Sequence, residues 1–190
     1  ENGDASLSDR NPTDHPVILS GDIGTLGDAA DNSYHVLFFD GGTGVGIGTN
    51  VAANVTPATV LDGVTVTGGN ADGTFPDNIG GGLLCDGNGS TNTCSPALTG
   101  VTFTGNKART GGAIYNNGDI SGESSPVITN AIFNGNEALV GGAIYNNGNS
   151  GTSSPVITNA TFTGNSAATS GSARGGAIFN NGNNGGTSSP

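Results

Sequence analysis

Short apolar runs recur along the chain at a nearly constant interval, separated by stretches rich in glycine, asparagine, serine and threonine. In the clearest repeat, residues 125–152, these runs span residues 127–129, 131–133 and 143–145. They contain β-branched and aromatic residues and are too short for helices, so the pattern predicts three strands in each repeat.

Asn-Gly pairs at 134–135 and 147–148 predict sharp corners, because glycine adopts a positive φ at little steric cost. Proline opens successive copies of the repeat at intervals of 30, 29 and 35 residues: Pro96, Pro126, Pro155 and Pro190. Self-similarity at this period is typical of solenoids. Three strands joined by corners predict one coil of a parallel β-helix, in which equivalent residues stack about 4.8 Å apart.

Stacked coils align equivalent residues into columns. The sequence predicts an aromatic column, an aliphatic column and an amide ladder, formed by Phe103, Phe133 and Phe162, by Ile114, Ile144 and Ile178, and by Asn106, Asn136 and Asn165. Their expected role is structural, because solenoid coils are held together by contacts with their neighbours. The 190 residues suffice for about six coils of roughly 30 residues.

We expect one continuous domain with two parts. Residues 1–94 form irregular acidic coils and residues 95–190 form regular repeat coils. The chain starts and stops partway through a repeat, which predicts a longer parent polypeptide.

The repeat contains F-x-x-N followed by G-G-A-I, with Phe103, Phe133 and Phe162 each opening one copy. This pairing resembles the repeat of the chlamydial polymorphic outer membrane proteins and of bacterial right-handed parallel β-helix surface proteins. The resemblance implies an all-β, right-handed parallel β-helix, secreted or displayed on a bacterial surface and often adhesive. It implies no catalytic residue.

The formal net charge of −11 lies entirely in the first half of the chain. Residues 1–94 carry one arginine and twelve acids, whereas residues 95–190 carry three cations and three acids. Nucleic acid is therefore an unfavourable partner, because nothing neutralises a phosphate backbone. No apolar run reaches the length of a membrane span.

Two groups of residues are candidates for special chemistry. Asp22, Asp28 and Asp31 lie in a glycine-bearing loop, a composition that suits Ca²⁺ but equally suits solvated turn acids. No other cofactor is expected. Cys85 and Cys94 flank a short loop, and in a secreted chain they predict a disulfide, with two free thiols as the alternative.

Four function classes remain. A polysaccharide-acting β-helix enzyme is disfavoured, because no paired carboxylates stand out and Arg109 and Arg174 lie near different coils without an evident acidic partner. An ice-binding solenoid is disfavoured, because the outward threonine pairs are interrupted at Ile132 and Asn134.

Tyr115, Tyr145 and Phe179 recur at one position of the repeat. Their expected role is packing over a coil corner.

The favoured hypothesis is a non-enzymatic extracellular structural or adhesive solenoid, the stalk or binding face of a larger adhesin. The alternative is a filament subunit that assembles through its open sheet edges. The corresponding partners are a surface glycan or protein ligand, or further copies of the chain.

Overall fold

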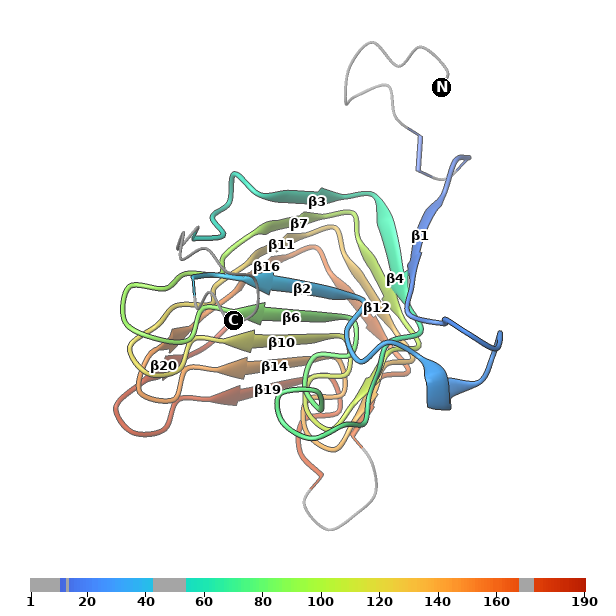
Figure 1. Ribbon diagram of the computed structural model, residues 1–190. Coiled ribbons are helices and arrows are strands. Elements are labelled where there is room, and N and C mark those ends of the chain that lie inside the picture. The colour runs from blue at the N-terminus through green and yellow to red at the C-terminus, as the bar shows by residue number, and fades with distance from the viewer. Residues whose placement is uncertain (1–10, 13, 43–53, 168–172) are drawn as a thin grey trace.

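A computed structural model of the protein describes residues 11–12, 14–42, 54–167 and 173–190. The described chain is built from short strands that stack, coil upon coil, into parallel sheets (Figure 1). The first sheet contains β1 (Val17–Ser20), β4 (Val64–Thr67), β8 (Thr102–Thr104), β12 (Ile132–Asn134) and β17 (Thr161–Thr163). The second contains β2 (Leu37–Asp40), β6 (Leu83–Asp86), β10 (Ile114–Asn117), β14 (Ile144–Asn147) and β19 (Ile178–Asn181).

Three smaller sheets complete the coils. One contains β3 (Val60–Asp62), β7 (Ala97–Thr99), β11 (Val127–Thr129) and β16 (Val156–Thr158). Another contains β5 (Asn70–Ala71), β9 (Lys107–Ala108), β13 (Glu137–Ala138) and β18 (Ser166–Ala167). The last pairs β15 (Thr152–Ser153) with β20 (Thr187–Ser188), and one 3-10 turn, η2, spans Ala29–Asp31.

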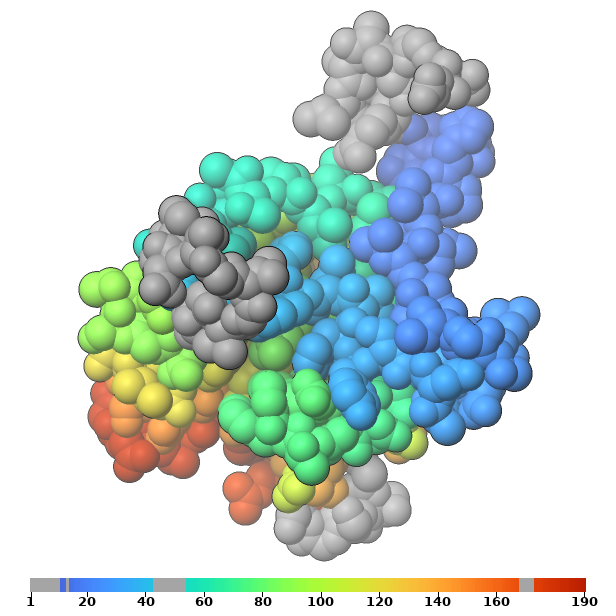
Figure 2. Space-filling model, in the orientation of Figure 1, coloured from blue at the N-terminus to red at the C-terminus, as the bar shows by residue number. Residues whose placement is uncertain are grey.

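The architecture confirms the predicted right-handed parallel β-helix. Every strand pair among the described residues is parallel and joins one coil to the next, as β8, β12 and β17 do. The successive coils appear as colour layers from green to red in the space-filling view (Figure 2). The two largest sheets hold five strands each, so the expected six coils are not confirmed.

The interior is formed by the columns that stacking produces. Phe103, Phe133 and Phe162 stack with ring centroids 5.3 and 4.7 Å apart and with ring planes within 5° of parallel. Ile114, Ile144 and Ile178 occupy one register position of β10, β14 and β19. Burial of these columns removes apolar surface from water in every coil, which is the main source of the fold's stability.

The chain turns after both predicted Asn-Gly pairs, but the predicted positive φ is wrong at one of the two glycines. Gly135 has a φ of +61°, as expected for the corner after β12. Gly148, in contrast, does not adopt a positive φ. Glycine is required there because a Cβ atom would lie 1.9 Å from the carbonyl oxygen of Thr187 in the next coil. Close approach of two coils, and not a left-handed backbone, therefore explains this glycine.

Candidate binding surface on the outer face of one sheet

Side chains alternate in direction along the strands of the second sheet, because successive residues of a strand point to opposite faces. In β10, Ile114 belongs to the interior cluster, whereas Tyr115 packs outside with Ile79 and Leu84. Two rows therefore run across the outer face, one residue per coil. The first row is mostly aromatic and consists of Phe38, Leu84, Tyr115, Tyr145 and Phe179. The second row is polar and consists of Asp40, Asp86, Asn117, Asn147 and Asn181.

The aromatic row forms a continuous stack over three coils. Tyr115 and Tyr145 have ring centroids 5.0 Å apart and an interplanar angle of 2°, and Phe179 follows 5.3 Å beyond Tyr145. Burial is the main cause that raises the pKa of both tyrosines, and side-chain hydrogen bonds join the phenols of Tyr115 and Tyr145 to Asn147 and Asn181. The phenols are therefore neutral and held in place at neutral pH.

A groove of about 580 Å³ runs along this stack. We call it the arginine groove, and its principal residues are Phe75, Arg109, Tyr115, Tyr145, Arg174 and Phe179. The side chain of Phe75 is 72% exposed, so the groove offers an apolar wall to solvent as well as an aromatic floor.

The backbone places the two arginines along one wall of the groove. The Leu139 amide donates to the carbonyl of Arg109 at 2.9 Å, and the Arg174 amide donates to the carbonyl of Leu139 at 3.3 Å. The arginines are thus two coils apart, about 10 Å at the spacing of parallel strands. Both are exposed, and no described carboxylate forms an ion pair with either. Lys107, in contrast, pairs with Glu137 at 3.6 Å.

Polar side chains form amide rows beside the stack. In the inner row, Asn117 donates to Asp86 at 3.0 Å, Asn147 to Asn117 at 3.0 Å and Asn181 to Asn147 at 3.1 Å. The outer row is formed by Asp119, Asn149 and Asn184 at the next corner. There Asn149 donates to Asp119 at 2.9 Å and Asn184 to Asn149 at 2.7 Å. Asn117 and Asn147 of the inner row are buried, whereas the side chains of the outer row are half-buried or exposed, so a ligand can reach the remaining donors and acceptors of the outer row.

Asp86 is a carboxyl group of this face whose pKa is also perturbed. Burial raises its pKa above 3.8, hydrogen bonds from Asn88 and Asn117 oppose the shift, and the adjacent charge of Asp40 adds to it. The folded state thus takes up a proton at Asp86 more readily than the unfolded chain, so its contribution to stability falls as the pH rises through the folded pKa.

We expect Asp86→Asn to stabilise the protein at pH 7 by about 1 kcal/mol. The amide keeps both acceptor contacts and continues the inner row, while a half-buried charge disappears. Urea unfolding at pH 7 and at pH 3 measures the effect. The gain should shrink at pH 3, where Asp86 is largely protonated, and an equal gain at both pH values would contradict the electrostatic cause.

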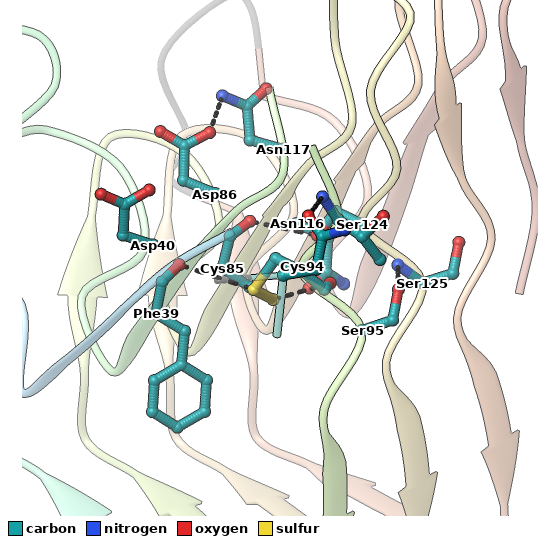
Figure 3. The surroundings of a disulfide bond; sticks show 12 residues. Phe39, Asp40, Cys85, Asp86, Cys94, Ser95, Asn116, Asn117, Ser124 and Ser125 are labelled. Carbon is teal, nitrogen blue, oxygen red and sulfur yellow. Dashed lines mark hydrogen bonds between the residues drawn. A yellow bond between two sulfur atoms is a disulfide. The ribbon is translucent and has the colours of Figure 1, made fainter. Parts of the chain in front are cut away.

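The predicted disulfide is confirmed. Cys85 and Cys94 are fully buried and joined at 2.05 Å (Figure 3). Cys85 occupies the register position of Asn116, which begins a buried amide column by donating to Asn146 at 2.8 Å. Around it the Ser124 hydroxyl donates to the Cys85 carbonyl at 3.1 Å. The disulfide therefore cross-links a corner at which later coils place polar side chains.

The candidate calcium ligands have local partners in the loop after β1. Asp22 accepts from the Gly27 amide, Asp28 from the Ala30 amide and Asp31 from the Thr25 amide, at 3.1, 3.0 and 2.7 Å. Over the described ranges, histidine, cysteine, aspartate and glutamate side chains form no group of three or more suited to a metal ion. Calcium binding stays a prediction without a ligand cluster behind it.

Comparison with protein families, curated proteins and solved structures gives no match. The resemblance to the chlamydial repeat consequently has no family match behind it, and what the structure supports is the parallel solenoid itself. Within the described ranges, helices long and apolar enough to span a membrane are absent.

The recurrence of Tyr115, Tyr145 and Phe179 in the sequence predicts packing over a coil corner, but it does not predict the groove that runs beside them. Arg109 and Arg174 lie near different coils without an evident acidic partner, so the sequence does not predict that they line one groove. Both arginines line the groove, but the register aligns Arg174 with Val140 and Thr110, one residue past Arg109, so the repeat alone does not predict that they share a wall.

Proposed function

We propose that this protein is a non-enzymatic, extracellular structural and adhesive β-solenoid, a stalk or binding face of a larger adhesin at a bacterial surface. The observation that best supports this proposal is the division of polar side chains. Interior amides such as Asn106 and Asn136 bond coil to coil, whereas the outer row of Asp119, Asn149 and Asn184 repeats once per coil within reach of solvent.

The outer row suits an extended glycan. Amides and a carboxylate offer donors and acceptors to sugar hydroxyls, and they recur at the spacing of the coils, about 4.8 Å. The corner that holds them is fixed by hydrogen bonds between coils, so binding orders few side chains. Pre-organisation of this kind limits the entropic cost of binding.

We expect Asn149→Ala to weaken glycan binding about tenfold, equivalent to the loss of one or two hydrogen bonds. A glycan array identifies the ligand, and calorimetry measures the change. Asn159→Gly is the control, because Asn159 donates to Asn130 in an amide pair at another corner and has a positive φ that glycine tolerates. Equal losses in both variants, or no glycan bound by the wild-type chain, would overturn the proposal.

A second candidate function is assembly of the chain into an extracellular filament. The observation that favours it is a pair of complementary exposed surfaces, the arginine groove and the acidic loop that follows β1, residues 22–31.

A further inference from the structure

The arginine groove requires an occupant of mixed chemistry. Its floor and one wall are aromatic, and aliphatic side chains of Ile79 and Leu139 also line it. Two of the three lysine and arginine residues in the described part of the chain lie on its wall. A purely polar anion would leave the apolar walls exposed to water, and a neutral apolar ligand would leave the two guanidinium groups without a negatively charged partner. The best occupant therefore carries both apolar groups and negative charge.

The same chain presents such a group in the acidic loop, residues 22–31. Leu26 is 90% exposed and Ile23 is 54% exposed, so both apolar side chains face solvent. Asp22, Asp28 and Asp31 carry the negative charge of this loop. The loop projects from the side of the solenoid next to β1 (Figure 1), and its atoms protrude in the space-filling view (Figure 2).

Internal hydrogen bonds hold the acidic loop in shape. Both carboxylate oxygens of Asp22 accept from the Gly27 amide at 3.1 Å, and Asp28 caps the 3-10 turn η2 by accepting from the Ala30 amide. The loop is thus a preformed projection with the exposed Leu26 midway along it, and docking it would order little additional chain.

We propose that the acidic loop of one copy docks into the arginine groove of a second copy. Leu26 and Ile23 pack on the aromatic floor, and the exposed Asp28 and half-buried Asp22 carboxylates face Arg109 and Arg174. This inference rests on the second candidate function, filament assembly, and assigns its contact to these two surfaces in place of the open sheet edges.

The contact is heterologous, because the loop and the groove are different surfaces of the same chain. Each docked pair keeps one unused loop and one unused groove, so association continues until the copies close a ring or extend a filament. Opposite charges steer the two surfaces together and make the association weaker at high salt.

Sedimentation velocity over a range of protein and salt concentrations tests the proposal. We expect the wild-type chain to associate with rising concentration and less so at high salt. Leu26→Lys, and the double variant Arg109→Glu with Arg174→Glu, should weaken association at least tenfold. These side chains are exposed, so circular dichroism and melting temperature should match wild type. Lys107→Glu is the control, because it reverses a charge in the coil of Arg109 outside the groove.

Mixing the variants gives the sharpest result. Leu26→Lys retains an intact groove, and the double arginine variant retains an intact loop. Each should be monomeric alone, whereas their mixture should form dimers that stop at two copies, because the only contact available uses the two intact surfaces.

Three outcomes would overturn the loop-and-groove contact. One is a wild-type chain that stays monomeric up to about 1 mM, far above the Kd of specific contacts. Another is association that the variants leave unchanged. In that case the chain still assembles, but the contact would be made by the open sheet edges. The third is a monomer whose groove binds an acidic polysaccharide, seen as binding to wild type and not to the double arginine variant.

Discussion

Gly118→Ala is expected to cost about 4 kcal/mol or more of unfolding free energy, the range in which single substitutions abolish marginal folds. A Cβ atom at Gly118 would lie 1.8 Å from the Thr152 carbonyl oxygen and 3.0 Å from the Ser124 amide nitrogen. Both are backbone atoms, one in the adjoining coil and one six residues further along the same coil, and no rotamer change can relieve the contact. The Gly118 carbonyl also accepts from the Thr152 amide at 3.0 Å, so the coils must separate and lose this bond.

Gly135→Ala is the matched control for this experiment. Gly135 has a φ of +61°, but an added Cβ atom would meet nothing within 4 Å. Its cost should be only the strain of a left-handed alanine, about 1–2 kcal/mol. Chemical unfolding of both variants separates a steric cause from a conformational one. Similar losses of unfolding free energy in the two variants would show that the close contact between coils at Gly118 is not what makes its substitution destabilising.

The fold is readable from the sequence because solenoid stacking makes it a nearly one-dimensional problem. The runs that became β11, β12 and β14 recur with their Phe and Ile positions in phase, and each coil contacts only its neighbours. The two-residue strands β9, β13 and β18 escaped prediction, because Lys107–Ala108 and its equivalents have no strand preference of their own. Their pairing is imposed by the register of the flanking strands.

The arginine groove was harder to predict for a related reason. Phe75 reaches it from the loop between β5 and β6, and Arg174 reaches it from a later coil in which the repeat is lengthened. Strand periodicity places residues on a face, but it does not say which loop folds back over that face.

The disulfide was predictable from the sequence because Cys85 and Cys94 are close along the chain and are its two cysteines.

The second large destabilisation is expected on substitution of Asn136, a member of the interior amide ladder. Its Oδ1 atom accepts from the backbone amide and from the Nδ2 atom of Asn106, both at 3.1 Å. Its Nδ2 atom donates to the Phe103 carbonyl at 3.0 Å and to Asn165 Oδ1 at 2.9 Å. The side chain is fully buried, so all four hydrogen-bonding positions of the amide are satisfied within the protein.

We expect Asn136→Leu, a substitution of similar size, to destabilise the protein by about 3 kcal/mol or more, because it removes the side-chain hydrogen bonds and leaves the buried amide of Asn106 and the buried carbonyl of Phe103 without this partner. The apolar side chain offsets only part of this cost, since those groups cannot reach water. Asn149→Leu is the control, because Asn149 lies in the half-exposed outer row where water replaces lost partners. Its cost should stay below about 1 kcal/mol. If urea unfolding gave equal losses for the two variants, the buried ladder would contribute no more than a surface row, and the coils would be held together by their apolar columns and backbone bonds alone.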